Sequence, residues 1–323
     1  MPDNDTLTSD LVNPYQLSDA DGYTWLKGSL HTHTTNSDGE EEPQDRLDQY
    51  VAQGYDFLCL SDHMDITRVD SVKVPDDFVL IQGAELHPHN PFGGRQFHLV
   101  CLNFHEDMDS PAMPPQHVID RVNEQGGAVW LAHPHWCSTN ILRDVIPLKG
   151  LKGIEIFNTT CRCMGRGESG PHWDDWMDQT NQLLPAIAND DAHAKESENR
   201  DTYQGWTMVR VKDRTVDAAM DAMNTGASYS STGPEIHDIK FQYMEDEPSG
   251  AKFFEATIKC SEARRVLAIN DQTGSEYWEH GKTFEQCQWH IAASKWVRFE
   301  IIDPDGNKAW SNPFDLTALR PEA

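Results

Sequence analysis

Short apolar runs alternate with amphipathic runs along the chain from about residue 25 to residue 231. This alternation is typical of βα units that surround a mostly parallel sheet or barrel. Each apolar run is read as a buried strand, and polar residues follow most of them. The expected strands end in the segments LHTH (30–33), FLCLSDH (57–63), VLIQGAELH (79–87), FHLVCLNF (97–104), AVWLAHPH (128–135), GIEIFN (153–158) and PAIANDDAH (185–193).

Amphipathic runs between these strands predict helices over Pro43–Gly54, Pro115–Gly126 and Thr215–Gly226. The first two begin with proline and end with glycine, the usual residues at helix starts and ends. After about Gly233 the helical pattern stops, and short alternating segments such as HDIKFQYM and WVRFEII follow. The sequence DPDGN (303–307) predicts a tight turn between two strands, because Asp-Gly adopts the positive φ angles that such turns need.

These patterns divide the 323-residue chain into two expected domains. Residues 1–233 form an α/β domain, of which residues 1–24 are an N-terminal lead-in. Residues 234–323 form a small antiparallel β-sandwich.

The charge of the chain limits its partners. It has 53 acidic and 26 basic residues, which gives a formal net charge of −27. Such a surface repels phosphate backbones and acidic membranes, so a nucleic-acid polymer is disfavoured as a partner. No apolar run approaches the length that spans a bilayer, and the opening MPDNDTLTSD lacks the features of a signal peptide. The odd number of cysteines, 7, favours free thiols, and we expect a cytoplasmic protein without membrane contact.

Histidines and carboxylates recur at the ends of the expected strands. His31 and His33 are two residues apart, so their side chains leave the same face of the strand. The ends of barrel strands form one active-site face, which would bring such residues together. Imidazole and carboxylate ligands suit Mn, Fe or Zn, and the candidates outnumber the ligands of one ion, so two or three divalent transition metals are expected. The same spacing recurs in Glu85/His87, His133/His135 and Asp191/His193, and Asp62-His63 ends a further strand.

Six of these segments, in this order, resemble the PHP (polymerase and histidinol phosphatase) family. The resemblance covers roughly residues 25–233. Within the family, the chain is similar to stand-alone CehA/McbA-like metallohydrolases, which also carry phrases like ASYSSTGPEI (227–236) and AWSNPF (309–314). The segments are LHTHTTNSDG (30–39), SDH (61–63), GAELH (83–87), AHPH (132–135), GIEIFN (153–158) and NDDAH (189–193).

The resemblance implies a distorted, TIM-like (β/α)7 barrel with seven strands that holds the metals. It assigns one metal to His31, His33, Glu85 and Asp191, a second to Glu85, His98 and His133, and a third to His63, His193 and Asp38. His98 is preferred to His87 and His89 because a histidine precedes a hydrophobic strand at this place in the family. His87 and His89 are then supporting or loop residues, while His135 and Glu155 are expected to line the pocket and take part in catalysis. Glu155, at a strand end, is also a candidate to orient a ligating imidazole.

The predicted activity is that of a metal-dependent phosphoesterase, which attacks a small phosphorylated metabolite or nucleotide with a metal-bridging hydroxide. Arg162 and Arg166, in a loop after a strand end, and His135 are the candidates for substrate binding. One alternative is hydrolysis of a carbamate, carboxylic ester or amide at the same metal centre. A second alternative is a PHP scaffold without catalysis, which would predict gaps in the ligand set, and the sequence has none.

Overall fold

The computed structural model describes residues 7–91, 93–137, 142–198, 200–246, 249–272, 274–292 and 294–320. Its N-terminal strands are β1 (Thr24–Ser29), β2 (Phe57–Leu60), β3 (Val79–Leu86), β4 (Leu99–Leu102), β5 (Ala128–Leu131), β6 (Leu151–Asn158), β7 (Ala186–Asn189), β8 (Trp206–Val211) and β9 (Ser228–Ser231). Its helices are α1 (Pro43–Ala52), α2 (Pro115–Glu124), α3 (Pro134–Cys137), α4 (Leu142–Val145), α5 (Thr159–Arg162), α6 (Gly170–Thr180) and α7 (Val216–Asn224).

The three helices predicted from the sequence are present as α1, α2 and α7. The first two begin at proline, and the side chain of Thr215 caps α7 by accepting a hydrogen bond from the Ala218 amide. Gly54, Gly126 and Gly226 follow the helix ends with φ angles of 72°, 81° and 72°. Glycine adopts this left-handed conformation at little cost, which explains why each helix stops there.

The N-terminal sheet contains the expected parallel strands together with antiparallel ones. The strands β1, β2 and β3 are parallel, as are β5, β6 and β7. The strand β4 instead runs antiparallel to both β3 and β5, and β8 runs antiparallel to β1. The described residues between β3 and β4 form no crossover helix, so the chain turns back beside β3. The start of β4 consequently lies next to the ends of β3 and β5.

The N-terminal sheet is curved, so that β8 and the segment after β1 contact β7 and the segment after it. The Thr207 hydroxyl of β8 bonds both the amide and the carbonyl of Ala188 in β7, each at 3.0 Å. An isolated parallel bridge joins Thr32, after β1, to Ala192, after β7. The described strands still form one open pairing path, so the closed seven-stranded barrel stays a prediction.

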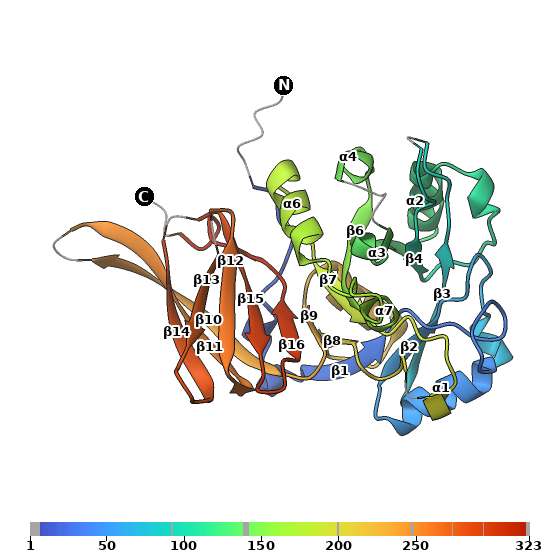
Figure 1. The fold of residues 1–323 in the computed structure, drawn as a ribbon, viewed down its shortest axis with the longest axis horizontal. Helices are drawn as coiled ribbons and strands as arrows, with labels where there is room; N and C mark the ends of the chain where they lie inside the picture. The colour runs from blue at the N-terminus through green and yellow to red at the C-terminus, as the bar shows by residue number, and fades with distance from the viewer. Residues whose placement is uncertain are drawn as a thin grey trace.

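The C-terminal strands form two layers that face each other across a core (Figure 1). The sheet β10-β11-β14 packs on a sheet that continues through β12, β13, β15 and β16, with Phe254 and Phe299 in the shared core. Because β16 pairs with β9, this second sheet is continuous with the N-terminal one, and the domain division at residue 233 stays a prediction. The strands are β10 (Ile236–Asp246), β11 (Ala251–Ala263), β12 (Arg265–Asn270), β13 (Gly274–Trp278), β14 (Phe284–Ile291), β15 (Trp296–Ile302), β16 (Lys308–Ser311) and β17 (Phe314–Asp315).

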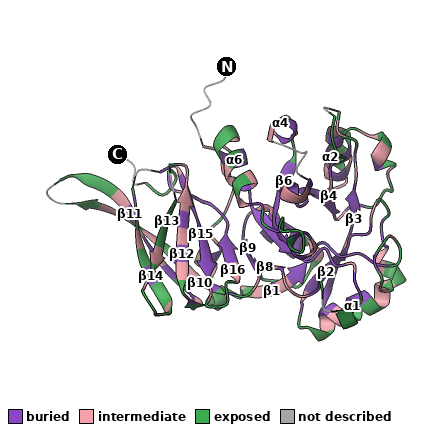
Figure 2. Ribbon diagram, viewed as in Figure 1, coloured by how far each residue is buried: buried purple, intermediate pink, exposed green. Residues whose placement is uncertain are grey.

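Burial follows the layers of the fold (Figure 2). The central strands β2, β4, β5 and β7 are buried along their whole length, and exposed residues lie on the outer helices and on β13 and β14. In the described parts of the chain, no helix is long and apolar enough to cross a membrane.

A buried arginine joins the C-terminal layers to helix α6. Arg298 of β15 donates to both carboxylate oxygens of Asp174 in α6, at 2.6 and 2.7 Å, and to Glu300 at 2.7 Å. Its guanidinium also lies 4.8 Å from the ring centroid of Trp173. A charge this deeply buried is tolerated because each charged group has a partner.

Replacing Arg298 by methionine leaves Asp174 and Glu300 without that partner. We expect Arg298→Met to lower the free energy of unfolding by about 3 kcal/mol, measured by urea denaturation. The control is Lys282→Met, which removes an exposed pair with Glu279 and should leave the free energy of unfolding nearly unchanged. Equal unfolding midpoints for Arg298→Met and the unchanged protein would show that the buried pair adds nothing to stability.

Candidate metal centre

The predicted metal ligands gather at one end of the N-terminal sheet. Most of them come directly after a parallel strand, as expected for this fold class. His98 instead precedes a strand, and it reaches the same end because β4 is antiparallel to its neighbours. The ligands come from β1 (His31, His33 and the loop to Asp38), β2 (His63), β3 (Glu85), β4 (His98), β5 (His133) and β7 (Asp191, His193).

Glu85 lies at the centre of the cluster and is fully buried. Its Oε2 atom is 2.7 Å from His63 Nδ1 and 3.5 Å from His31 Nε2. Its Oε1 atom is 2.8 Å from His98 Nδ1 and 3.0 Å from His133 Nε2. Burial alone would raise the pKa of Glu85, but the imidazoles of His98, His31 and His133 outweigh it and hold the pKa well below its ordinary value. The carboxylate is therefore ionised and able to bridge two cations.

Asp191 forms a second centre beside Glu85. Its Oδ1 atom lies 2.9 Å from His33 Nε2, 3.2 Å from His31 Nε2 and 3.6 Å from His193 Nδ1. Burial opposes ionisation, but His31, His193 and His33 lower the pKa of this carboxyl below its ordinary value. Asp191 is thus a buried anion that needs positive charge beside it.

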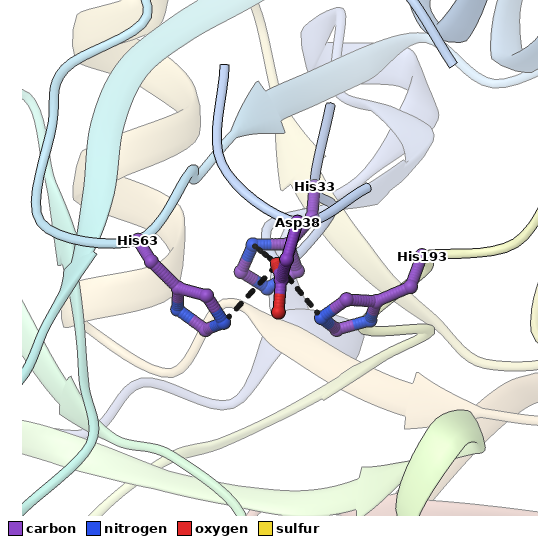
Figure 3. Close-up of side chains that lie close together, drawn as sticks. All are labelled: His33, Asp38, His63 and His193. Atoms are coloured by element: carbon purple, nitrogen blue, oxygen red, sulfur yellow. Dashed lines mark ion pairs between the residues drawn. The ribbon is translucent and has the colours of Figure 1, made fainter. Parts of the chain in front are cut away.

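A third group surrounds Asp38, which sits between the rings of His63 and His193 (Figure 3). Its Oδ1 atom lies 3.3 Å from His63 Nε2, 3.4 Å from His193 Nε2 and 3.9 Å from His33 Nδ1. Hydrogen bonds from His193 and His63 lower the pKa of Asp38. Burial lowers the pKa of His63, but Asp38 and Glu85 raise it more, to about 10. Unlike the other two carboxylates, Asp38 is largely exposed, with 58% of its side chain accessible.

Several buried polar atoms in the cluster have no hydrogen-bond partner, which shows that the residues fit metal ions. Most of these atoms lie close to one another or to Glu85 but without the angles of a hydrogen bond, and they are His31 Nε2, both ring nitrogens of His33, His63 Nδ1 and Asp191 Oδ1. A buried polar atom without a hydrogen-bond partner costs free energy. Here several such atoms converge on the same points, where one metal ion would contact more than one of them. Ligands that bind one ion at about 2.0–2.2 Å lie about 3 Å from each other, the spacing seen around Asp191. These clusters suit divalent metals, whereas a total of two or three ions stays a prediction.

The backbone at two of these ligands is in an unusual conformation. His133 and Asp191 have φ angles of 24° and 55°, in the left-handed region that residues with a Cβ seldom adopt. Such conformations cost of order 1–3 kcal/mol and concentrate at functional sites. The fold thus holds these two side chains where their local preferences would not place them.

Glu155 lies behind His31 and fixes the orientation of its ring. It accepts hydrogen bonds from His31 Nδ1 at 3.0 Å and from the His133 amide at 2.9 Å. Asn158 and Asn189 donate to the same carboxylate at 3.0 and 2.9 Å. With Nδ1 committed to Glu155, the free Nε2 of His31 faces the cluster. Glu155 does not line the cavity as predicted, because β6 places it in the buried layer beneath the ligands, and its geometry fits a positioning role.

Two further buried groups hold the loops that carry the ligands, and the sequence analysis missed their role. Asp62 accepts from the Thr34 amide at 2.8 Å and the Ser37 hydroxyl at 2.7 Å, which fixes the loop leading to Asp38. Arg46 donates to the carbonyl of His33 at 3.2 Å and to that of Ala194 at 2.9 Å, which ties the loop after β1 to the loop after β7. The role of Asp62 could have been predicted from its place in the SDH motif. That of Arg46 could have been predicted because it is a charged residue on the apolar face of a helix.

A cavity of about 480 Å³ opens beside the clustered ligands. The described ligands that line it are Asp38, His63, Glu85, His98, His133, Asp191 and His193. The sequence analysis assigned no substrate contact to its other lining residues, which are Trp136, Thr160, Cys161, Cys163, Met164, Arg200 and Asp201.

The residues predicted to bind substrate do not line this cavity. His135 instead bonds the Glu168 carbonyl through Nδ1 at 2.8 Å. Arg162 bonds Gln204 at the surface, and Arg166 is exposed. Arg162 ends α5 and Arg166 lies in the loop after it, both exposed, and Arg200 from a different loop lines the cavity in their place.

The two other histidines considered with His98 differ in position. His87 Nε2 lies 3.2 Å from Glu85 Oε2, and its ring stacks on His98 at a centroid distance of 3.9 Å. His87 is thus as close to the central carboxylate as several predicted ligands. The His89 amide bonds the Met113 carbonyl, and its side chain does not line the cavity.

Removing the central charge should empty the site. We expect Glu85→Gln to retain less divalent metal per chain after reconstitution and dialysis, because an amide cannot neutralise two cations. Elemental analysis measures the metal, and circular dichroism checks the fold. Glu279→Gln, a change at an exposed carboxylate on the far sandwich, should retain the full content. Equal metal content in both variants would contradict the assignment.

The positioning role of Glu155 predicts a weaker effect. Glu155→Gln should lower metal affinity by about 10- to 100-fold, measured by competition with a chelator, because His31 loses the partner that orients its ring. Glu276→Gln, which removes a surface pair with Arg265, serves as the matched control. If Glu155→Gln bound metal as tightly as the control, the carboxylate would have no influence on the ligands.

Comparison with known proteins places this fold among PHP-like structures. A solved two-domain protein from Bacteroides vulgatus, described as containing a predicted PHP-like metal-dependent phosphoesterase, matches with a TM-score of 0.52 and 17% identity over 94% of this chain and 98% of that one. An uncharacterised protein of Methanocaldococcus jannaschii is 27% identical over 145 residues, covering 41% of this chain and 82% of that protein. The 5'-3' exoribonuclease of Haemophilus influenzae is 37% identical over 90 residues, 27% of this chain and 31% of that enzyme. No family model matches the chain. The chain therefore has a PHP-like fold.

Proposed function

We propose that this protein is a metal-dependent hydrolase, and specifically a phosphoesterase that acts on a small phosphorylated molecule. The observation that carries this proposal is the pair of buried carboxylates, Glu85 and Asp191, surrounded by imidazoles whose buried nitrogens lack hydrogen-bond partners beside a cavity. The description of the Bacteroides vulgatus protein supports the same activity class. The closed barrel, the domain division at residue 233 and the CehA/McbA-like subtype belong to this proposal.

The ligand assignment gives each carboxylate a task. His31, His33 and Asp191 would hold one ion together with Glu85, and Glu85 would bridge to a second ion at His98 and His133. His63, His193 and Asp38 would hold the third. When bound, divalent Mn, Fe or Zn acidifies water to give a nucleophile and neutralises charge on phosphoryl oxygens.

Other residues of the chain orient this site and its substrate. Glu155 fixes the ring of His31, and Asp62 and Arg46 hold the ligand loops in place. The guanidinium of Arg200 lines the cavity, where it can donate to a phosphate oxygen. A cavity of about 480 Å³ fits a small molecule rather than a folded polymer.

One alternative keeps the metal centre and changes the electrophile to a carbamate, carboxylic ester or amide. The specific observation in its favour is that Arg200 is the one arginine or lysine among the described residues lining the cavity. Phosphoryl transfer sites usually add more positive charge, although metals supply much of it. A non-catalytic scaffold is disfavoured because every expected ligand position holds a residue able to coordinate.

The match to the Haemophilus influenzae exoribonuclease suggests a phosphodiester end of RNA as a further substrate to test. That match spans 31% of the enzyme, and the net charge of −27 opposes a polyanion. We therefore place 5'-phosphorylated RNA in the substrate panel as a competing outcome.

The activity test uses protein reconstituted with Mn, Fe or Zn and a panel of phosphate esters, carboxylic esters, carbamates and RNA. We expect metal-dependent turnover of a small phosphate ester that Asp191→Asn lowers by more than about 100-fold, the upper range for changes outside the ligand shell. Asp305→Asn, at an exposed turn, should keep full activity. Preferred turnover of carbon esters would favour the alternative electrophile, and no turnover with full metal loading would favour the scaffold.

A further inference from the structure

One side of the cavity is built from apolar and sulfur-containing side chains. We call Trp136, Cys161, Cys163 and Met164 the apolar wall. Trp136 comes from α3, which follows β5, whereas the other three lie in α5 and the turn after it. Met164 has 56% of its surface exposed, an unusual state for a large apolar side chain. Exposed apolar side chains beside a polar site are typical of ligand contact.

The apolar wall borders the metal ligands directly. The Trp136 ring packs edge-on against His98 and His133, with centroid distances of 5.5 and 5.2 Å. A group attached to a phosphate at the ligand cluster would therefore reach Trp136 without a spacer.

The polar atoms of this side of the cavity are already bonded within the protein. Trp136 Nε1 donates to Met164 Sδ at 3.4 Å, and the Cys163 thiol donates to the Thr159 carbonyl at 3.9 Å. The neighbouring Thr160 hydroxyl donates to the Asp191 carbonyl at 2.7 Å. What this side presents to a bound molecule is therefore ring faces, methylenes and sulfur, with few donors or acceptors to spare.

Arginine and lysine are scarce among the described residues around the cavity. Arg200 lines it and lies 3.9 Å from Glu198, so part of its charge is balanced. The guanidinium of Arg95 lies 5.7 Å from the Trp136 ring centroid rather than in the lining. A second phosphate on the substrate would need a further set of donors, which the described lining does not provide.

We propose that the substrate is a small ester that joins one phosphate to an apolar aryl or alkyl group, and that this group binds on the apolar wall. The proposal rests on the proposed phosphoesterase function and adds its specificity. In the reaction, a bond forms between a water oxygen and phosphorus, and the bond from phosphorus to the ester oxygen breaks. One water proton is transferred to the released alcohol or phenol, and the phosphate keeps the remaining hydroxyl.

The same wall discriminates against nucleotides. A base and a ribose carry several donors and acceptors, and an apolar surface would leave them without partners after water is removed. Sites reject such mismatched polar groups more strongly than they reject a missing methylene. The wall therefore favours an uncharged apolar group over a nucleoside.

The experiment compares benzyl phosphate with glycerol 3-phosphate and adenosine 5'-monophosphate on the metal-loaded full chain. The first two release alcohols of similar reactivity, so a difference in kcat/KM reports contact with the apolar group. We expect benzyl phosphate to be preferred to both others. Trp136→Ala should lower kcat/KM for benzyl phosphate by about 10- to 100-fold more than it lowers kcat/KM for glycerol 3-phosphate.

A second variant and a control separate specificity from damage to the site. Met164→Gln keeps the length of the side chain and has no ring contact with the ligand histidines, so it should lower the benzyl preference without loss of metal. Trp278→Ala removes another exposed tryptophan, on β13 of the sandwich, and should leave kcat/KM unchanged for both benzyl phosphate and glycerol 3-phosphate. Metal content is measured for every variant.

The outcomes distinguish this inference from the proposed function. If both wall variants lowered turnover of all phosphate esters equally, or if adenosine 5'-monophosphate were preferred, the apolar substrate would be wrong while the phosphoesterase remained. If no phosphate ester were hydrolysed by metal-loaded protein, the proposed function itself would be overturned.

Discussion

The buried carboxylate of Glu85 lies against the imidazoles of several histidines, and the need to balance its charge away from water controls the arrangement of the site. An ion of this kind is stable in a protein interior only when cations or donors surround it. Asp191 repeats the same condition a few ångströms away. Burial lowers the pKa of His63 and of His193, but the neighbouring carboxylates raise it more, which favours positive charge beside them. Divalent cations would meet the same need, with the candidate ligands already converging.

The scaffold around these carboxylates restricts their partners to one geometry. Glu155 sets the ring of His31 from the buried layer, and Arg46 joins two ligand loops through their carbonyls. The left-handed backbone at His133 and Asp191 persists because surrounding contacts hold it there. The candidate ligands are therefore held in place by the fold itself, which is the usual condition for tight and specific coordination of an ion.

The negative charge of the chain is compatible with the chemistry of the site, because most acidic residues lie at the surface and not in the site. Most of the charge of −27 is spread over the surface, where it is hydrated and screened. The carboxylates Glu85 and Asp191 of the site are buried and face imidazoles. Their negative charge therefore favours the binding of cations between these residues. The sandwich adds a buried charge of its own at Arg298, which anchors α6 beside the cavity-bearing half.

The sequence by itself was enough to identify histidines and carboxylates at strand ends, because the alternation of apolar and polar positions that marks a strand is a local pattern. The two-residue spacing of these side chains also places them on one face of the strand. His31, His33, Glu85 and Asp191 were predicted as ligands in this way and through the family resemblance, and the structure brings them within a few ångströms. Helices bounded by proline and glycine were predictable for the same local reason.

The tertiary structure decided what depends on direction and distance between remote segments. It placed His98 in the cluster through the antiparallel β4, turned Arg162 and Arg166 toward solvent, and brought Trp136 and Met164 to the cavity. A loop residue carries no periodic signal that tells which way it faces, because its neighbours in space come from distant parts of the chain. The candidate ligands could therefore be named from the sequence, and their assignment to metal ions stays a prediction. The shape and polarity of the cavity beside them required the packed fold.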